Sequence, residues 1–207
     1  GTIEGAALRE LQTLPQIIAG IDEKSAARAR ELFEYFAPEC IILHALEEAE
    51  MVKLLNNSFR DFNFAFANEF ARACDAFNLD TNKIIHAANK AYIRDKIPVP
   101  SPGVGGYCLS KDPYILQYSA RKQGYDMKLP TAGRRVNEEM PEYIYRQIMK
   151  FLNAHHAKTA TKRVAFLGFA FKGSPPTSDI RFSPTIDVLK LLKQHPDIWI
   201  SAHDFVV

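Results

Sequence analysis

The most regular pattern of apolar and polar positions in the chain lies between residues 47 and 77. Apolar side chains recur there at steps of three and four residues, and neither glycine nor proline interrupts them. These positions are Met51, Leu54, Leu55, Phe59, Phe62, Phe66, Phe70, Ala73 and Phe77. The spacing predicts one long amphipathic helix. Its phenylalanines exceed what one small domain needs to cover, which favours a homodimer formed through helix 47–77, with packing inside a single chain as the alternative.

Short apolar runs alternate with helical patterns in the residues before this helix. We expect a helix over residues 6–14, a strand over 17–21, a helix over 23–36 and a strand over 40–43. Asp22 directly precedes the second helix and is a typical N-cap residue. Two short strands with a helix between them indicate the end of an α/β unit.

Three further helices are predicted after the long one. The first ends at Asn89, the second spans 112–122, and the third opens at Pro130. Because a proline removes a backbone donor, Pro141 predicts a kink or a break inside the third helix.

The last part of the chain has an α/β pattern. Residues 163–168 form an apolar run that ends in glycine, residues 184–193 are amphipathic, and residues 197–201 form a second apolar run. This order predicts the beginning of a doubly wound parallel sheet. The expected fold is a mostly α-helical central domain with a long helix, followed by the βαβ start of a Rossmann-like α/β domain. The expected parts are residues 1–46, 47–158 and 159–207.

Composition and charge exclude several classes of function. The 207 residues are 47% hydrophobic, and 26 basic against 24 acidic residues give a net charge of +2. Because the charges are interspersed, we expect no nucleic-acid partner, and pairs such as Arg134-Arg135 are expected to be solvated or to face a ligand. No apolar run reaches the ~20 residues of a membrane span, so we expect no membrane partner and a cytoplasmic location. Three cysteines fit a reducing compartment, and Cys40 and His44 lack the partners of a metal site.

A loop rich in proline and glycine at residues 98–113 carries the first candidate for chemistry. Its prolines stiffen the chain and its glycines allow turns that other side chains would block, so that Cys108 arrives at the start of a helix. A helix N-terminus and the nearby Lys111 both favour the thiolate form of a cysteine. Cys108 is therefore a candidate nucleophile. The alternative is a small buried cysteine in a tight turn.

Two further sets of polar residues have spacings that suit catalysis. Lys53 and Asn57 are four residues apart on the long helix, where they could stabilise an oxyanion. Asp112 follows Cys108 by four residues and could act as a general base for water. Each set has a plain alternative, which is a pair of surface residues for the first and a carboxylate that stabilises a helix start for the second.

The segment after strand 163–168 is the third candidate. Residues 168–173 read Gly-Phe-Ala-Phe-Lys-Gly between a strand and a helix, where α/β sheets bind phosphate groups, although the glycine spacing is not that of a dinucleotide-binding loop. Lys172 is the expected phosphate ligand. Asp179 and Arg181 precede the next helix, and their alternative role is a buried ion pair that fixes the loop.

Four motifs together resemble one protein family. They are Glu4-Gly5-Ala6-Ala7, the pair Lys53-x-x-x-Asn57, the run Pro102-Gly103-Val104-Gly105-Gly106-Tyr107-Cys108 through Asp112-Pro113, and Leu167-Gly168-Phe169-Ala170-Phe171-Lys172 continuing to Asp179-Ile180-Arg181-Phe182-Ser183-Pro184. Their order resembles the UDP-glucose/GDP-mannose dehydrogenase family of NAD-dependent nucleotide-sugar 6-dehydrogenases. The resemblance covers nearly the whole chain, as the central domain plus the start of the C-terminal domain. Residues 1–46 would be the end of the N-terminal NAD-binding domain.

The resemblance implies a four-electron oxidation of the sugar C6 alcohol to a carboxylate, with two molecules of NAD. Cys108 would attack the C6 aldehyde left by the first hydride transfer, and the second hydride transfer would convert the thiohemiacetal into a thioester. Lys53 and Asn57 would stabilise the charged oxygen, and Asp112 would help to activate the hydrolytic water.

The resemblance also implies which residues bind the substrate and the cofactor. The substrate is a UDP-sugar, and the residues that would contact it are Glu4, Arg94, Gly105, Gly106 and Lys172. Arg94 would do so in the neighbouring subunit of the dimer. Lys111 and Arg181 would lie at the NAD cofactor.

Parts of the family pattern do not occur in these residues. The N-terminal Rossmann domain and most of the C-terminal domain are missing, so we expect the isolated chain to be inactive. The glycine-rich loop resembles the branch that handles UDP-N-acetylhexosamines, whereas Lys111 resembles the UDP-glucose branch, and we favour a UDP-N-acetylhexosamine. The alternative function is a non-catalytic homodimerisation module, for which Cys108 should be no more reactive than Cys40 and Cys74.

Overall fold

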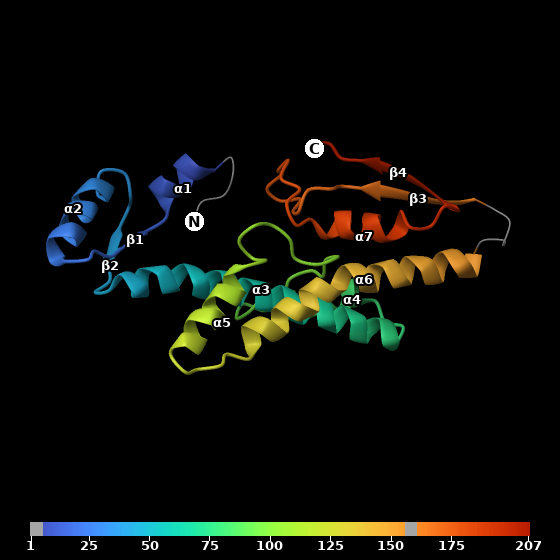
Figure 1. The fold of residues 1–207 in the computed structure, drawn as a ribbon, viewed down its shortest axis with the longest axis horizontal. Helices are drawn as coiled ribbons and strands as arrows, with labels where there is room; N and C mark the ends of the chain where they lie inside the picture. Colours follow the sequence, from blue (N-terminus) through green and yellow to red (C-terminus); the bar gives the residue numbers. More distant parts are fainter. Residues whose placement is uncertain (1–5, 156–160) are drawn as a thin grey trace. The chain divides into compact units, whose positions relative to one another are not determined.

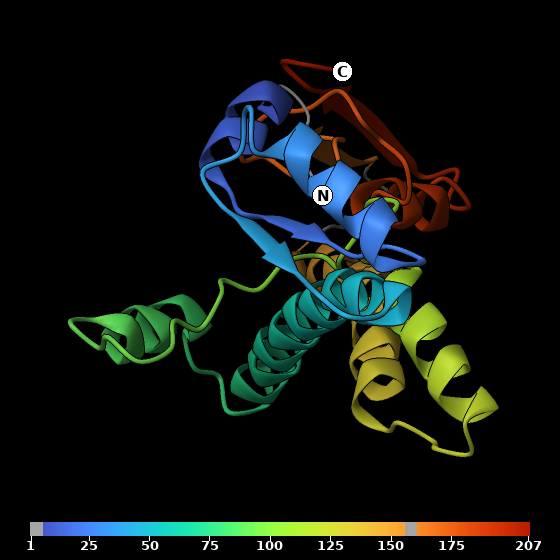
Figure 2. The ribbon, with the colours of Figure 1, turned by 90° about the vertical axis from the view of Figure 1, so that its left-hand side faces the viewer.

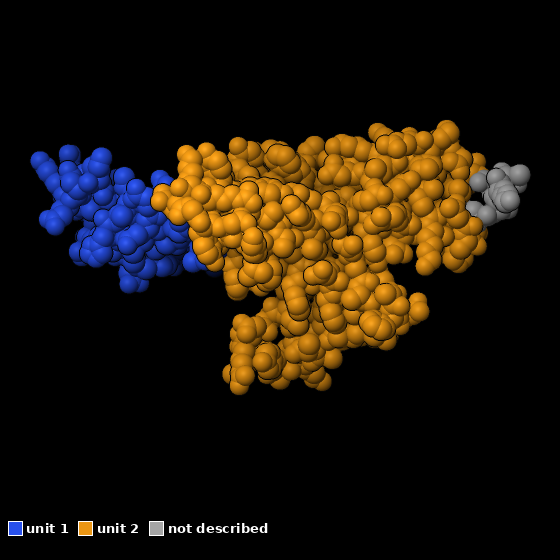
Figure 3. All heavy atoms as spheres, turned by 60° about the horizontal axis from the view of Figure 1, so that its bottom comes forward, with its two compact units in different colours: residues 1–56 blue, residues 57–207 orange. Residues whose placement is uncertain are grey.

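The computed structural model describes residues 6–155 and 161–207. The chain divides into two compact units, residues 1–56 and 57–207, which Figure 3 shows in different colours. Among the described residues, each unit contains one sheet of two parallel strands. The domain boundaries expected at residues 46 and 158 stay predictions.

The first unit contains a small βαβ arrangement. Its elements are α1 (Ala7–Thr13), β1 (Gln16–Ile18), α2 (Glu23–Phe33) and β2 (Cys40–Ile42), as labelled in Figure 1. The two strands are parallel, with Gln16 opposite Cys40 and Ile18 opposite Ile42. The carboxylate of Asp22 accepts from the Ser25 N–H at 2.7 Å, which confirms Asp22 as the N-cap of α2. The expected extension of this helix to residue 36 is wrong, because α2 ends at Phe33.

Helices form the main part of the second unit. They are α3 (Leu46–Ala76, which begins in the first unit), α4 (Thr81–Asn89), α5 (Asp112–Lys122) and α6 (Leu129–His155). The long helix and the helix over 112–122 confirm the sequence predictions within one residue at each end. A break at Pro141 was wrong, because α6 continues through this residue.

The end of the second unit is a βαβ unit packed on α6. Its elements are β3 (Lys162–Leu167), α7 (Pro184–Leu192) and β4 (Ile198–His203). The strands are parallel, with Lys162 opposite Ile198 and Leu167 opposite His203. One hydrophobic core joins them to α6, and its buried members are Leu152, Phe166, Val188, Leu192 and Ile198. The mostly α-helical fold followed by a βαβ start is therefore confirmed.

Helix α4 and the loop after it stand apart from α3 in Figure 2. Asp80 caps this helix by accepting from the Lys83 N–H at 3.1 Å. The side chain of Asn89 then closes the loop that follows, because it accepts from the Ile97 N–H at 2.9 Å and donates to the Ile97 carbonyl at 2.8 Å.

Within the described residues, no helix is both long enough and apolar enough to cross a bilayer.

Candidate functional site

The cysteine loop, residues 101–111, follows a path that depends on glycine. Gly106 has a φ of +83°, in the left-handed region that favours glycine. A Cβ at Gly105 would lie 2.2 Å from the backbone oxygen of Phe182, so no side chain fits where these two segments pass. The Gly106 N–H also donates to the Arg181 carbonyl at 3.2 Å. The cysteine loop is thus joined to the segment that leads into α7.

Cys108 lies in the turn directly before α5 and is exposed. Its carbonyl oxygen accepts from the Lys111 and Asp112 N–H groups at 3.2 and 2.9 Å, so helical hydrogen bonding begins at the cysteine. The Ser110 hydroxyl donates to the Gly106 carbonyl at 2.8 Å and closes the turn. The alternative of a buried cysteine is therefore wrong, and a nucleophilic Cys108 stays the prediction.

Asp112 connects the start of α5 to α3. Its side chain is 1% exposed, and its Oδ2 accepts from Asn57 Nδ2 at 2.6 Å. Its Oδ1 accepts from Lys111 Nζ at 2.5 Å, and this hydrogen bond raises the pKa of Lys111. The structure therefore brings three of the predicted site residues together. A buried carboxylate with these two partners fixes the amide of Asn57, and its expected action on water stays a prediction.

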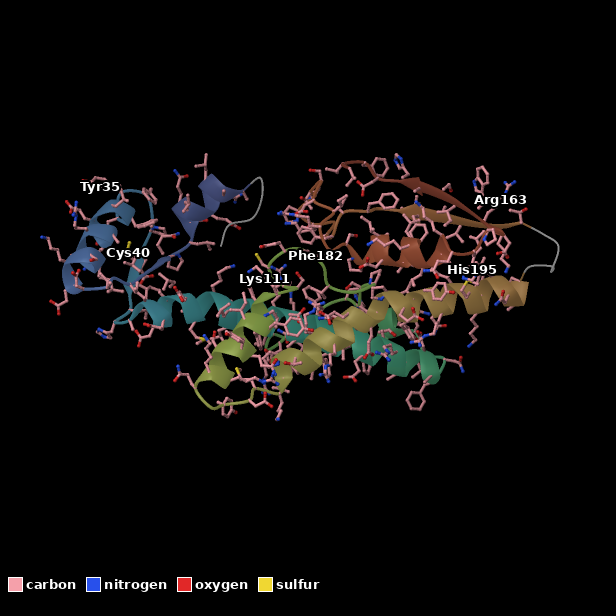
Figure 4. The ribbon with its side chains drawn as sticks, in the orientation of Figure 1. Tyr35, Cys40, Lys111, Arg163, Phe182 and His195 are labelled. Atoms are coloured by element: carbon pink, nitrogen blue, oxygen red, sulfur yellow. The ribbon has the colours of Figure 1, made fainter. Side chains whose placement is uncertain are left out.

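The ring of Tyr107 gathers two cations beside Cys108. Lys111 Nζ lies 5.2 Å from the ring centroid and the Arg181 guanidinium carbon lies 5.6 Å from it, both within cation–π range. Lys111 and Phe182, both labelled in Figure 4, pack against the Tyr107 ring. The ring centroids of Tyr107 and Phe182 are 6.3 Å apart. Arg181 also pairs with Asp179 at 2.6 Å and lowers the pKa of that carboxyl. The expected ion pair is present, with Arg181 exposed and not buried.

Lys172 lies close to the cysteine loop through its neighbour in the sequence. A Cβ at Gly106 would lie 2.7 Å from the ring of Phe171, so that ring packs directly on the loop. Lys172 Nζ lies 5.5 Å from the centroid of the same ring, and the residue is half-buried. The Phe171 N–H donates to the Asp179 carbonyl at 3.0 Å, which ties the Lys172 segment to the Arg181 segment.

Arg134 is a member of the site that the sequence interpretation placed wrongly. It is 2% exposed, so protein groups surround its charge instead of solvent. Nη1 donates to Asp61 Oδ1 at 2.6 Å and to the Leu109 carbonyl at 3.1 Å, and Nη2 donates to the Val104 carbonyl at 3.1 Å. Nε donates to Glu138 at 3.2 Å. A buried guanidinium therefore holds the backbone on both sides of Cys108.

A chain of buried amides continues from Asp61 to the start of the cysteine loop. Asn137 Nδ2 donates to Asp61 Oδ1 at 2.9 Å, and Asn68 Nδ2 donates to Asn137 Oδ1 at 2.9 Å. Asn68 Oδ1 in turn accepts from the Ser101 N–H at 2.8 Å, and the Ser101 hydroxyl donates to the Gly103 carbonyl at 2.7 Å. Both asparagines are buried. The sequence analysis missed these residues.

One signal in the sequence could have found the buried face of α6. Arg134 and Asn137 extend the stripe that continues through Pro141 and Ile144 at steps of three and four residues. Polar residues on such a stripe must find partners inside the protein. Asp61 lies 73 residues away from Arg134, however, and no local pattern indicates that pairing.

Asp204 occupies the strand-to-helix position where the sequence suggested phosphate binding. Its Oδ2 accepts from the N–H groups of Phe169 and Ala170 at 2.6 and 3.3 Å, and these contacts lower the pKa of Asp204. Two of the backbone donors after β3 are thus already bound within the chain. Lys172 is therefore the better candidate for an anion in this segment than the backbone around Gly168.

The other predicted site residues are Lys53, Arg94 and Glu4. Lys53 is exposed on α3 and belongs to the first unit, and Arg94 is exposed in the loop that Asn89 closes. Glu4 lies outside the described residues.

Comparison with known proteins gives one consistent family. A model of the UDP-glucose/GDP-mannose dehydrogenase family, central domain, matches residues 47–139. UDP-N-acetyl-D-mannosamine dehydrogenase of Pyrococcus horikoshii is 38% identical over 189 residues, which are 91% of this chain and 44% of that protein. The protein of the same name in Escherichia coli is 33% identical over 210 residues, with 99% of this chain and 47% of that protein covered. The chain thus spans less than half the length of these curated relatives.

Solved structures agree with the sequence matches. The UDP-D-ManNAc dehydrogenase of Pyrococcus horikoshii has a TM-score of 0.87 at 35% identity, covering 99% of this chain and 47% of that chain. A UDP-glucose dehydrogenase from Pyrobaculum islandicum has a TM-score of 0.83 at 27% identity, covering 100% of this chain and 46% of that chain. The chain therefore belongs to the UDP-glucose/GDP-mannose dehydrogenase family and carries the central domain of that family.

Proposed function

We propose that this chain carries the nucleophile of an NAD-dependent UDP-sugar 6-dehydrogenase. The observation that carries the proposal is the exposed Cys108 at the start of α5. The loop that contains it is hydrogen-bonded to buried side chains such as Arg134. Family membership supports the class of reaction, because the similar proteins are named as UDP-sugar dehydrogenases. A cysteine next to a helix N-terminus and a lysine suits attack on an aldehyde.

The proposed reaction oxidises the sugar C6 alcohol to a carboxylate. The first hydride leaves C6 and the alcohol becomes an aldehyde, to which Cys108 Sγ adds to give a thiohemiacetal. Loss of the second hydride gives a thioester, and water then cleaves the C–S bond, releasing the carboxylate and the thiol. Lys53 and Asn57 stabilise the oxygen on C6, and Asp112 holds Asn57 and assists the attacking water.

Positive charge beside Cys108 suits a cofactor that contains a pyrophosphate. Lys111 and Arg181 both lie within 6 Å of the Tyr107 ring, and Arg181 is exposed. These two cations would hold NAD through its phosphates, and the nicotinamide ring supplies the hydride acceptor for each oxidation.

The proposed substrate is a UDP-N-acetylhexosamine. Its support is that the curated relatives are named UDP-N-acetyl-D-mannosamine dehydrogenases. Lys172 would contact the nucleotide-sugar phosphates, and the backbone of Gly105 and Gly106 would contact the sugar. Glu4 is proposed as a sugar contact on the family resemblance alone.

A homodimer through α3 is part of the proposal. Phe59 and Phe66 are 64% and 55% exposed on this helix, far more than large apolar side chains in a covered face. Arg94 stands in an exposed loop closed by Asn89, a position from which it would reach the sugar in a partner subunit. The same exposed phenylalanines favour the second candidate function, a homodimerisation module without catalysis.

The decisive experiment compares wild-type and Cys108→Ser forms of the full-length protein encoded by the gene. With UDP-N-acetylmannosamine and NAD, we expect the wild type to form the uronic acid and about two NADH per sugar, and the variant to lose acid formation by about a thousandfold or more. Cys40→Ser serves as the matched control and should keep the activity. Full activity in the Cys108 variant would sink the proposal.

Thiol labelling separates the two candidate functions in the 207-residue chain itself. The enzyme proposal expects iodoacetamide to modify Cys108 faster than Cys40 and Cys74 near neutral pH, whereas the dimerisation module expects no such preference. We expect this chain alone to form no NADH with NAD and UDP-sugars, because it covers only 44% of the length of its relative in Pyrococcus horikoshii.

A further inference from the structure

Arg134 is the most deeply buried cation of the site, and the reaction proposed above gives it no role. Its side chain is 2% exposed, and that of its partner Asp61 is 1% exposed. A buried ion pair of this kind is weak support for stability, because removing two charges from water costs as much as their attraction returns. An apolar pair of similar volume would fill the α3–α6 interface equally well, so the charges need another explanation.

The explanation lies in where the remaining donors of Arg134 point. Nη1 donates to the Leu109 carbonyl and Nη2 donates to the Val104 carbonyl, both at 3.1 Å. Leu109 follows Cys108 directly, and Val104 precedes it by four residues. One rigid, planar group therefore binds the two sides of the turn that presents the thiol. An apolar side chain in this place would leave both carbonyl oxygens without these donors.

Asp61 fixes the orientation of this guanidinium from α3. It accepts from Arg134 Nη1 at 2.6 Å and from Asn137 Nδ2 at 2.9 Å through the same oxygen. Asn137 is linked through Asn68 to the Ser101 N–H, where the cysteine loop begins. The loop is thus attached at its start and on both sides of Cys108, each time to a buried side chain of α3 or α6.

We propose that Arg134, oriented by Asp61, is a positioning residue that fixes the backbone of residues 104–109 and so the direction of the Cys108 thiol. The role of Cys108 rests on the proposed function, whereas the attachment of the loop does not. Arg134 touches no substrate in this proposal and acts through the backbone of the cysteine loop. The neighbouring Arg135 is exposed and supplies a matched control on the same helix.

Lysine in place of Arg134 keeps the charge but cannot reproduce the attachment. A single ammonium on a flexible stem lacks the planar fork that reaches Asp61 and two carbonyl oxygens at once. We expect Arg134→Lys to raise hydrogen–deuterium exchange of the amides in residues 104–111 by about tenfold or more, since hydrogen bonds to a charged group are lost. Arg135→Lys should leave exchange in this segment unchanged.

A second measurement separates loosening of the loop from general unfolding. Cys74 is buried in α3 and reacts with iodoacetamide only when the helix opens. In Arg134→Lys we expect Cys74 to stay protected while the loop amides exchange faster. The double variant Asp61→Asn with Arg134→Gln removes both charges together, leaves no unpaired charge inside, and should loosen the loop in the same way.

The kinetic readout uses the full-length protein encoded by the gene. We expect Arg134→Lys to lower kcat by about tenfold or more while KM for the UDP-sugar changes by less than about threefold, which a general loss of folded protein would not produce. Unchanged loop exchange in both variants would overturn the positioning role. Loop exchange that rises while kcat is retained would also overturn it. The exchange result does not depend on the Cys108→Ser outcome that decides the proposed function, whereas the kcat result requires the proposed activity.

Discussion

Only one oxygen of the Asp61 carboxylate is hydrogen-bonded, which sets the titration of this residue. Oδ1 accepts from both Arg134 and Asn137, and Oδ2 has no hydrogen-bond partner among the described residues. Burial raises the pKa of Asp61 to about 6, although Arg134 and Asn137 act in the opposite direction. The group is therefore ionised near neutral pH and neutral in mild acid.

This titration predicts a specific pH dependence of stability. Between about pH 4 and about pH 6 the unfolded chain has lost the Asp61 proton, while the folded chain still binds it, so the free energy of unfolding falls as pH rises. The shift of roughly two pKa units corresponds to about 3 kcal/mol. We expect Asp61→Asn to remove this slope, measured by urea unfolding across the window. Parallel pH profiles of the two proteins would contradict the prediction.

At the scale of residues, the sequence could predict chemistry that depends on local spacing. Cys108 and Asp112 are one turn apart, and the structure places them at the start of α5, as their spacing indicated. The pairing of Arg134 with Asp61 could not be predicted, because it depends on how α3 and α6 pack. Its charge led us to expect Arg134 in solvent or facing a ligand. The residue is instead buried, because it lies on the stripe of α6 that packs inside the protein.

At the scale of elements, the loop after α4 is closed by one side chain. Asn89 bonds both the N–H and the carbonyl of Ile97, so residues 90–96 form a loop whose ends are held together. Arg94 and the 95%-exposed Ile93 lie in it. A loop that projects an arginine and an apolar side chain suits contact with a second molecule.

We expect Asn89→Ala to open this loop while leaving the rest of the fold intact. Loss of two hydrogen bonds should lower the local stability by about 1–3 kcal/mol, which appears as faster hydrogen–deuterium exchange at Ile97. Asn82→Ala, at an exposed position of the same helix, is the control and should not change exchange there. Equal protection of Ile97 in both variants would show that the loop has other attachments.

Helix bounds were predictable wherever apolar spacing and end signals agree. Residues 112–122 form α5 at the expected positions, with Pro113 in its first turn and Gly124 at φ +79° after its end. Pro141 misled because a proline costs a helix one hydrogen bond, and the buried contacts of α6 on both sides of Pro141 outweigh that loss.

At the scale of the whole molecule, the proposed homodimer depends on the exposed face of α3. Phe59 and Phe66 are seven residues apart, two turns along the same face, and both are exposed in the single chain. Sequence periodicity predicted the helix and its apolar excess. It could not show which side of the helix the chain itself covers, because that depends on where α6 packs.

We expect the chain to sediment at twice the mass of one copy, and Phe59→Glu with Phe66→Glu to convert it to a monomer. The two introduced carboxylates would lose their water in the dimer contact without gaining partners. This would weaken association by several kcal/mol, on the order of the cost of burying an unpaired charge. Phe205→Glu, at a position 95% exposed after β4, is the control and should leave the mass unchanged. A wild-type monomer at every accessible concentration would remove the α3 dimer from the proposal.

The two glycines before Tyr107 differ in what a suppressor screen can recover. A Cβ at Gly105 would meet the backbone oxygen of Phe182, and no side-chain substitution removes a backbone oxygen. A Cβ at Gly106 would instead meet the ring of Phe171, which a smaller residue takes away. We expect Phe171→Ala to restore part of the stability lost in Gly106→Ala, leaving about 1 kcal/mol of backbone strain, as measured by urea unfolding. No second-site side-chain substitution should rescue Gly105→Ala. We therefore expect glycine to be required at this position even in proteins that carry compensating mutations.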